Sequence, residues 1–180
     1  MMKNICVFCG AKNGNNPAWI EQATHLGQGI AQRGWRLVYG GAGSGLMGTT
    51  ARATLQSDGK VLGIMPEGLR TEQAIESDKV ELRIVKNMQE RKEMMMEEAD
   101  AFVIIPGGIG TLDELFEVWT AKQLNLLTKP IVIANWNAYY DHLIAFIQQS
   151  HQSGFLTDSH LQKIIFVNTV DEVFDTLGAY

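Results

Sequence analysis

The sequence is poor in cysteine and proline and has no long hydrophobic run. Only 2 of its 180 residues are cysteines and 4 are prolines, while 46% are hydrophobic and 19% are charged. This composition excludes a collagen-like or disordered chain, and at this length packing alone can stabilise a core without disulfides or a structural metal. No apolar stretch reaches the roughly 18 residues that a membrane-spanning helix needs, and the N-terminus runs directly into a strand-like segment. We therefore expect a cytoplasmic protein with no membrane partner.

Positive charge is also in short supply. The chain has 15 Lys and Arg residues against 20 Asp and Glu residues, which gives a formal net charge of -5. Such a chain is ill suited to binding the phosphate backbone of a nucleic acid as its main task. We therefore expect no nucleic-acid partner, and any anion that the protein binds must be held by a local site.

The two cysteines form a Cys6-x-x-Cys9 pair, but no second pair of cysteines or histidines follows at the spacing of zinc ligands. Residues three apart in an extended segment point to opposite faces of a sheet. We interpret Cys6 and Cys9 as reduced residues in or beside the core. The 4 histidines are scattered without ligand spacing, so the sequence predicts no metal site.

Short runs of β-branched residues alternate with longer helical segments along the whole chain. This alternation predicts a doubly wound α/β fold, with a mainly parallel, Rossmann-like sheet and helices on both faces. No linker, repeat or low-complexity stretch divides the sequence, so we expect a single domain over residues 1–180. The predicted strands are Asn4–Phe8, Arg36–Tyr39, Val61–Met65, a weaker Glu81–Val85, Ala101–Ile105, Pro130–Ala134 and Ile164–Val167, and the predicted helices are 17–33, 46–57, 87–98, 111–126, 138–152 and 170–178.

In such a fold, ligands bind beyond the carboxyl ends of the strands, where three loops of this chain are rich in glycine. One of them, Gly43-Ser-Gly-Leu-Met-Gly48, matches the G-x-G-x-x-G fingerprint of dinucleotide sites. It follows the second predicted strand, whereas the fingerprint normally follows the first. Three interpretations stay open: a dinucleotide site, a tight turn that only allows close packing of helix and sheet, and, as we favour, a loop that lines a different nucleotide site.

The loop Pro106-Gly-Gly-Ile-Gly-Thr111 is the most informative stretch. Its glycines allow main-chain N–H groups to face a ligand, and the helix predicted to begin near Thr111 adds unpaired donors and its dipole. This combination suits a phosphate group. The Gly-Lys-Ser/Thr ending of a P-loop is missing, so we do not expect hydrolysis of nucleoside triphosphates.

Glu114 follows this loop and has two interpretations. Thr111-x-x-Glu114 matches a capping box, in which the glutamate only caps its own helix. Alternatively, Glu114 shares a site with Arg91, because the helix that carries Arg91 descends to the strand that climbs back to the glycine loop. Both side chains then lie at the ligand edge of the sheet. A competing interpretation of Arg91 is that it and the charged residues beside it form an ordinary solvated helix face.

Apolar residues near these charges point to packing. The predicted helix 87–98 contains four methionines, a composition that favours core or subunit contact and is consistent with a dimer interface. Phe116, close to Glu114, is expected in the core.

Two motifs resemble those of a known family. Pro106-Gly-Gly-Ile-Gly-Thr-Leu-Asp-Glu114, with Met88-Gln-Glu-Arg-Lys92 upstream, resembles the LONELY GUY family, the cytokinin riboside 5'-monophosphate phosphoribohydrolases, many of which carried the older label of possible lysine decarboxylase. The resemblance covers most of the chain. It implies a homodimeric, Rossmann-like nucleotide-binding enzyme that hydrolyses the N-glycosidic bond of an adenine-type nucleoside 5'-monophosphate, such as a cytokinin riboside 5'-monophosphate or AMP. The products would be free base and ribose 5-phosphate, and the resemblance implies no organic cofactor and no metal.

The same resemblance assigns residues to the site by motif. It implies that Arg91 and Glu114 are catalytic. The phosphate-binding residues that it implies are Gly107, Gly108, Gly110 and Thr111, and further substrate contacts are implied for Met88, Lys92, Thr120 and, across a one-residue gap in the alignment, Glu72.

These residue types suit the implied reaction. Cleavage builds positive charge on the ribose, so the Glu114 carboxylate can stabilise an oxocarbenium-like transition state or activate water. Arg91 stays cationic and can anchor phosphate or orient the carboxylate and the substrate. The proton donor to the leaving base stays open, with Asp113 and Glu117 as acidic neighbours.

Other functions compete with this one. A decarboxylase that uses pyridoxal phosphate needs a Schiff-base lysine and a partner for the pyridinium nitrogen, and the sequence marks neither. The main alternative is a non-catalytic nucleotide-binding or carrier protein of the same fold. The presence of both Arg91 and Glu114 favours the enzyme. AMP and prenylated AMP stay unseparated as substrates.

Overall fold

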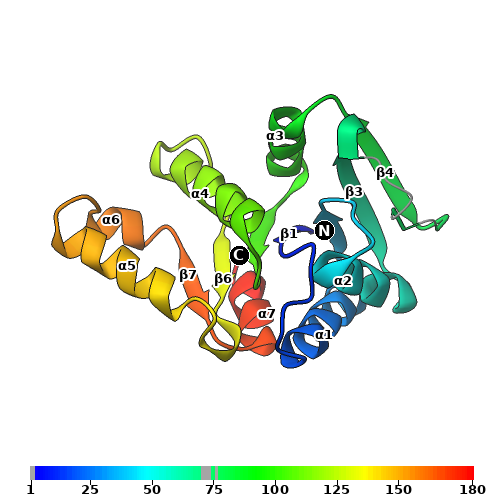
Figure 1. Ribbon diagram of the computed structural model, residues 1–180, viewed down its shortest axis with the longest axis horizontal. Helices are drawn as coiled ribbons and strands as arrows, with labels where there is room; N and C mark the ends of the chain where they lie inside the picture. Colours follow the sequence, from blue (N-terminus) through cyan, green and yellow to red (C-terminus); the bar gives the residue numbers. More distant parts are fainter. Residues whose placement is uncertain (1–2, 70–73, 76) are drawn as a thin grey trace.

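The computed structural model describes residues 3–69, 74–75 and 77–180, which form a twisted sheet with helices packed on both faces (Figure 1). The strands are β1 (Asn4–Phe8), β2 (Arg36–Tyr39), β3 (Lys60–Pro66), β4 (Val80–Val85), β5 (Ala101–Ile104), β6 (Ile131–Ala134) and β7 (Ile165–Val167). The helices are α1 (Ala18–Gln32), α2 (Gly45–Gln56), α3 (Met88–Glu98), α4 (Ile109–Gln123), α5 (Asp141–Gln152), α6 (Asp158–Leu161) and α7 (Val170–Gly178), with the single 3-10 turns η1 (Glu67–Leu69) and η2 (Trp136–Ala138).

The strands lie in the order β4-β3-β2-β1-β5-β6-β7, and all the strand pairs that the structure describes are parallel. The prediction of a doubly wound, Rossmann-like α/β fold is confirmed. The chain moves from β1 outward to β4 and then from β5 outward in the other direction. Because the loops after β1 and β5 therefore diverge, a crevice is expected between them at the carboxyl edge of the sheet.

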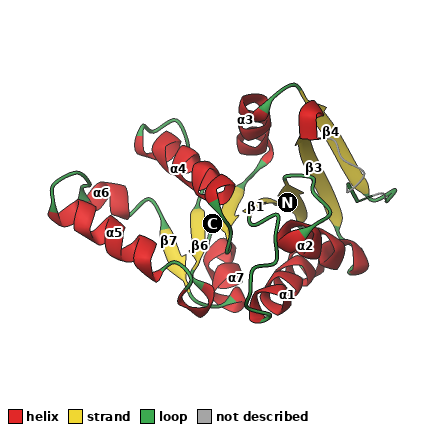
Figure 2. Cartoon of the chain, viewed as in Figure 1, coloured by secondary structure: helices red, strands yellow, loops and turns green. Residues whose placement is uncertain are grey.

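Alternate residues of the central strands fill two separate cores. Ile5 and Val7 of β1 pack with α1, α2 and α7, whereas Cys6 and Phe8 pack with α3, α4 and α5 on the opposite face. Helices α1, α2 and α7 lie on one side of the sheet, and α3 and α4 lie on the other (Figure 2). Because both faces are covered, β1 is apolar without interruption from Ile5 to Phe8 rather than alternating. Cys6 and Cys9 are buried free thiols in different cores, as the sequence predicts.

The predicted elements are found, with differences mainly where the chain turns. The predicted helix 138–152 begins only at Asp141, because Asn137 and Ala138 have φ values of 53° and 60° and form a turn instead. Helix α6 was not expected, since its 4 residues are too few to show a helical period. Phe116 is 40% exposed rather than part of the core. None of the described helices is both long enough and apolar enough to cross a membrane.

Candidate active site

A cavity of about 890 Å³ lies beyond the carboxyl ends of β1 and β5, where the order of the strands changes direction. Its walls come from the β1–α1 loop, the starts of α1 and α2, helix α3, the β5–α4 loop with α4, and the turn before α5. Apolar side chains line much of it, among them Trp19, Leu46, Met47 and Met88. Its size and position are those of a small-molecule site in an open α/β sheet.

Gly10, two residues after the end of β1, connects the three glycine-rich loops through hydrogen bonds. Its N–H group donates to the carbonyl oxygen of Pro106 at 3.1 Å, and its own carbonyl accepts from the N–H group of Met47 at 3.2 Å. The approach is so close that a Cβ atom on Gly107 would lie 2.8 Å from the Gly10 nitrogen. The absence of side chains at these positions allows the close approach, and the hydrogen bonds of Gly10 fix the relative placement of the loops.

The Gly43–Gly48 loop packs against the loop after β1. Gly45 has a φ of +62°, and a Cβ atom there would lie 2.2 Å from the carbonyl carbon of Ala11. Gly43 and Gly45 do not line the cavity, whereas the following Leu46 and Met47 do. The fingerprint glycines thus permit close packing, and the loop supplies apolar side chains to the site.

The start of α4 provides a row of unpaired hydrogen-bond donors. The helix begins at Ile109 with Gly108 as its N-cap. Within the described chain, none of the backbone N–H groups of residues 107–111 donates a hydrogen bond. Of these residues all but Ile109 line the cavity. Unpaired donors at a helix N-terminus, reinforced by the helix dipole, are suited to binding a phosphate.

Glu114 lies one turn further along α4 and does not cap the helix. Because α4 begins two residues before Thr111, that threonine lies inside the first turn, where its hydroxyl oxygen would be 2.1 Å from a Cβ atom on Gly107. The capping-box interpretation is therefore wrong. Glu114 is 4% exposed, and the little surface it has faces the cavity.

Arg91 meets Glu114 from helix α3, with Arg91 Nη1 3.2 Å from Glu114 Oε1. The Arg91 Nε atom donates to the carbonyl oxygen of Ile64 in β3 at 3.1 Å. The Nη2 atom lies so close to Gly40 that a Cβ atom there would be 1.8 Å away. Because strand β3, the end of β2 and helix α4 all restrain it, the guanidinium group holds the carboxylate in one place.

Burial raises the pKa of Glu114 to about 7. The positive charge of Arg91 opposes this shift, and the negative charges of Asp113 and Glu117 add to it. A carboxyl group with this pKa is present in both protonation states near neutral pH. Such a group can both accept and donate a proton in a reaction.

Lys92 lies beside Arg91 in sequence but does not line the cavity. Its Nζ atom pairs with Glu117 and, at 3.1 Å, with Asp113 Oδ2. Hydrogen bonds to Glu117 and then Asp113 raise the pKa of Lys92. Its ammonium group therefore joins α3 to α4 and also holds the two acidic neighbours of Glu114 away from the cavity.

The remaining predicted contacts lie in different places. Met88 is 41% exposed and lines the cavity. Thr120 is exposed on α4 outside the cavity, because six residues beyond Glu114 the helix has already left it. Glu72 lies outside the described residues. Among the residues that the structure does describe, no three His, Cys, Asp or Glu side chains are grouped to hold a metal ion.

Several lining residues, among them Lys12, Trp19 and Tyr139, were not predicted from the sequence as part of the site. Lys12 and Trp19 come from the β1–α1 segment, and Tyr139 comes from the turn before α5. The rings of Trp19 and Tyr139 meet edge to face, with centroids 5.1 Å apart. The available signal was position alone, since each residue follows a strand at the carboxyl edge of the sheet.

Solved structures share this fold at low sequence identity. A molybdenum cofactor carrier protein from Chlamydomonas reinhardtii superimposes with a TM-score of 0.74 at 18% identity, over 99% of this chain and 98% of that chain. A molybdenum cofactor binding protein from Rippkaea orientalis gives a TM-score of 0.71 at 22% identity, over 99% and 97%. These likenesses support the fold alone.

Sequence relatives are much closer. A probable cytokinin riboside 5'-monophosphate phosphoribohydrolase from Oryza sativa subsp. japonica is 39% identical, over 99% of this chain and 84% of the relative. A cytokinin riboside 5'-monophosphate phosphoribohydrolase from Rhodococcoides fascians is 41% identical, over 94% and 86%. The model of the family described as possible lysine decarboxylase matches residues 47–177. The resemblance inferred from the motifs is thereby confirmed: the chain belongs to this family, together with the cytokinin riboside 5'-monophosphate phosphoribohydrolases.

Proposed function

We propose that the protein hydrolyses the N-glycosidic bond of adenine-type nucleoside 5'-monophosphates, a cytokinin riboside 5'-monophosphate or AMP, to free base and ribose 5-phosphate. One arrangement carries the proposal: helix α4 presents a row of unpaired N–H groups at its start and, one turn later, the buried Glu114 with a pKa of about 7. The relatives from Oryza sativa and Rhodococcoides fascians bear names for this reaction.

In this proposal the N–H groups of residues 107–111 bind the 5'-phosphate. The dianion gains hydrogen bonds from donors that have no other partner in the described chain, and the dipole of the 15-residue helix α4 adds to the attraction. The ribose then extends along α4 toward Glu114. Arg91 keeps the Glu114 carboxylate in position through the contact of 3.2 Å.

The Glu114 carboxyl group handles the proton. The bond between C1' of the ribose and the base nitrogen breaks, and its electron pair leaves with the base, so positive charge develops on the ribose. Water attacks C1' and gives a proton to the Glu114 carboxylate, and the carboxyl group so formed donates that proton to the nitrogen of the departing base. Among the described lining residues Glu114 is the sole acid, since Asp113 and Glu117 are held by Lys92 outside the cavity.

The apolar walls of the cavity support a substrate whose base carries an apolar group. Leu46, Met47 and Met88 line the same space as the aromatic pair Trp19 and Tyr139. Burying each methylene of a prenyl chain against such walls is favourable by about 0.8 kcal/mol. A prenylated AMP should therefore bind more tightly than AMP.

A homodimer is part of the proposal. Ile109, Leu112 and Phe116 recur at i, i+3 and i+7, so they form one apolar stripe on α4. Ile109 is 89% exposed and Phe116 is 40% exposed. A second copy of the chain would cover this stripe. Light scattering should give twice the mass of one chain for the parent and the mass of one chain for Phe116→Glu.

We also propose a cytoplasmic location, where the free thiols of Cys6 and Cys9 would stay reduced.

The decisive experiment measures free base by chromatography. The purified protein is incubated separately with AMP, with isopentenyladenosine 5'-monophosphate and with adenosine, which lacks the phosphate. We expect base from both nucleotides, faster from the prenylated one, and little from adenosine. If both nucleotides bind and neither is cleaved, the protein is a carrier or sensor and the proposed reaction is wrong.

A further inference from the structure

The turn between β6 and α5 presents two adjacent tyrosines to the β5–α4 loop. Tyr139 is 38% exposed and lines the cavity, while Tyr140 is 3% exposed and does not line it. The Tyr139 ring is held edge to face between Trp19 and Tyr140, with centroid distances of 5.1 Å and 4.8 Å. Its orientation is therefore set by packing on both sides.

The turn itself is built to hold this orientation. Asn135 is 8% exposed, and its side-chain oxygen accepts from the Tyr140 N–H group at 2.7 Å while its amide nitrogen donates to Asp141 at 2.8 Å. Asn137 and Ala138 adopt positive φ values of 53° and 60°, a conformation that costs free energy in residues with a Cβ atom. Such a turn persists because its surroundings determine it.

Three successive carbonyl groups of the β5–α4 loop each accept a hydrogen bond from outside the loop. The Tyr140 hydroxyl donates to Ile105 O at 2.8 Å, and the Gly10 N–H group donates to Pro106 O at 3.1 Å. The Tyr139 hydroxyl donates to Gly107 O. Hydrogen bonds therefore restrain three consecutive peptide groups at the start of the β5–α4 loop.

Each of these bonds has a consequence on the other side of its peptide plane. In a trans peptide, the carbonyl of one residue and the N–H group of the next point in opposite directions, and no described peptide bond is cis. The Gly10 contact therefore orients the N–H group of Gly107, and the Tyr139 contact orients that of Gly108. Without such restraints, glycine backbones adopt many conformations.

The bond from Tyr140 differs because the next residue is a proline. The peptide between Ile105 and Pro106 has no N–H group, so the Tyr140 hydroxyl orients no donor. The pair thus contains its own control. Two neighbouring hydroxyl groups hold two carbonyls of one loop, but only Tyr139 holds a peptide that carries a phosphate-binding N–H group.

We propose that Tyr139 is a positioning residue for the 5'-phosphate, whose hydroxyl fixes the Gly107–Gly108 peptide so that the Gly108 N–H group is preorganised for the anion. The inference rests on the proposed function, since it names the residue that prepares the phosphate site of that reaction. It acts through the loop backbone.

The test compares Tyr139→Phe with Tyr140→Phe. Calorimetric titration with ribose 5-phosphate measures binding of the anion without any turnover. The Tyr139→Phe variant should bind ribose 5-phosphate about 5-fold more weakly than the parent, because it loses a hydrogen bond that orders a donor. Tyr140→Phe should bind within about 2-fold of the parent but melt at a lower temperature, because it leaves a buried carbonyl unpaired.

Kinetics give a second reading. With a nucleoside 5'-monophosphate, Tyr139→Phe should raise KM by the same factor and change kcat little, as expected when binding common to ground and transition states is lost. Equal affinity of the parent and Tyr139→Phe for ribose 5-phosphate would overturn the inference, and so would an equal loss in Tyr140→Phe. If the parent binds ribose 5-phosphate but releases no base from any nucleotide, the proposed function fails while the titration still decides the role of Tyr139.

Discussion

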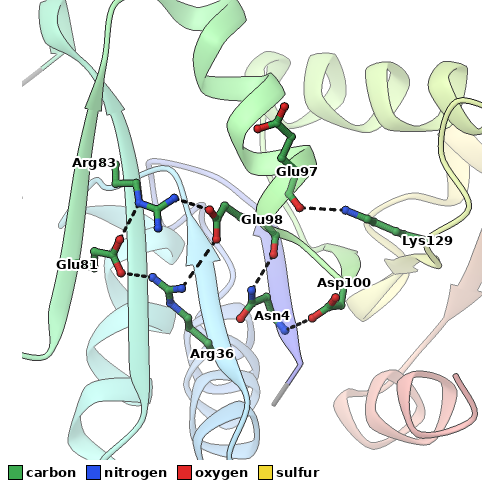
Figure 3. A network of polar contacts seen from close by, with 8 residues as sticks. All are labelled: Asn4, Arg36, Glu81, Arg83, Glu97, Glu98, Asp100 and Lys129. Atoms are coloured by element: carbon green, nitrogen blue, oxygen red, sulfur yellow. Dashed lines mark hydrogen bonds and ion pairs between the residues drawn. The ribbon is translucent and has the colours of Figure 1, made fainter. Parts of the chain in front are cut away.

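Helix α3 carries an arginine–glutamate contact at each end, and the two differ in almost every property. At its C-terminal end, near the amino ends of the strands, Glu98 joins a network with Arg36, Glu81 and Arg83 (Figure 3). At its other end, Arg91 meets Glu114 at the cavity. The network contains two cations and two anions, so its charges balance, whereas the cavity holds one buried pair.

The two places shift the pKa of a glutamate in opposite directions. Hydrogen bonding from Arg83 is the main cause that lowers the pKa of Glu81, a side chain that is 49% exposed. Burial raises the pKa of Glu114 to about 7 against the opposing charge of Arg91. In the network, water and several donors solvate the carboxylate, so the arginine–glutamate contact only stabilises the structure. In the cavity they do not, and the glutamate becomes an acid that titrates near neutral pH.

Replacing each glutamate with glutamine should separate the two ends of α3 most strongly. Glu114→Gln removes the group that accepts the proton, so turnover should fall about 10³-fold with the fold retained. Glu98→Gln removes a glutamate that is also paired with arginine, at the end of α3 away from the cavity, and should leave turnover within about 2-fold. The measurement is base release from a nucleoside 5'-monophosphate, with circular dichroism as the check on folding. Near-normal turnover by Glu114→Gln would remove it from the chemistry.

Replacing the arginines should have the next largest effect on turnover. Arg91→Ala leaves the Glu114 carboxylate without its nearby positive charge, so the Glu114 pKa should rise further and turnover at neutral pH should fall about 10²-fold. Breaking a buried pair is also destabilising by about 3–5 kcal/mol, so Arg91→Lys, which keeps a positive charge, is measured alongside. Arg83→Ala is the matched control at the network.

The pH dependence of the two arginine variants distinguishes charge from mere stability. If Arg91 tunes Glu114, the rise of kcat/KM with pH should move to higher pH in Arg91→Ala and lie closer to the parent in Arg91→Lys. An unchanged pH profile in a folded Arg91→Ala protein would contradict this role. Arg83→Ala should keep the parental profile.

The pH profile of the parent gives a smaller, direct test of the raised pKa. The ionised carboxylate of Glu114 accepts the proton from water, and its fraction grows as pH rises through about 7. The value of kcat/KM should therefore rise about 10-fold from pH 6 to pH 8, since a group with this pKa goes from about one-tenth to nine-tenths ionised. The expectation fails if kcat/KM levels off near pH 5, where an ordinary glutamate would already be ionised. The second ionisation of the substrate phosphate, near pH 6, is accounted for by titrating ribose 5-phosphate binding over the same range.

Much of the fold follows from the sequence because the central strands are buried on both faces. Runs such as Ile5–Phe8 are short, apolar throughout and rich in β-branched or aromatic residues, which is typical of strands buried on both faces. Strand β4 gave a weaker signal because several of its residues are exposed at the sheet edge. The start of α4 was misplaced because a glycine N-cap at Gly108 leaves no side-chain signature, while Thr111 imitates one.

The site divides in the same way between topology and local geometry. The meeting of Arg91 and Glu114 follows from the order of α3, β5 and α4, which the sequence reveals. The outward direction of Lys92 does not, because neighbouring helix residues point about 100° apart and only the packing decides which one faces inward. The hydrogen bond from Tyr139 to Gly107 joins loops that follow different strands, and no residue spacing in the sequence predicts it.

The smallest expected effect concerns the network itself. Glu81→Gln removes the carboxylate that accepts from Arg36 and Arg83 and should lower the free energy of unfolding by about 0.5–1 kcal/mol at low salt, and by less at high salt. Glu97→Gln is the matched control, because the Glu97 side chain points away from the network and the bond to Lys129 is accepted by its backbone carbonyl (Figure 3).

The sign of the pH dependence follows from the lowered pKa of Glu81. The folded protein binds a proton at Glu81 more weakly than the unfolded chain does, so this contribution is present above the ordinary pKa of 4.5 and is lost as pH falls through the lowered value. Urea unfolding should show the difference between parent and Glu81→Gln at pH 7 and a much smaller one at pH 3. Turnover should stay at the parental rate in both Glu81→Gln and Glu97→Gln. A loss of turnover in Glu81→Gln alone would mean that the two ends of α3 are coupled, and the network would then belong to the working site.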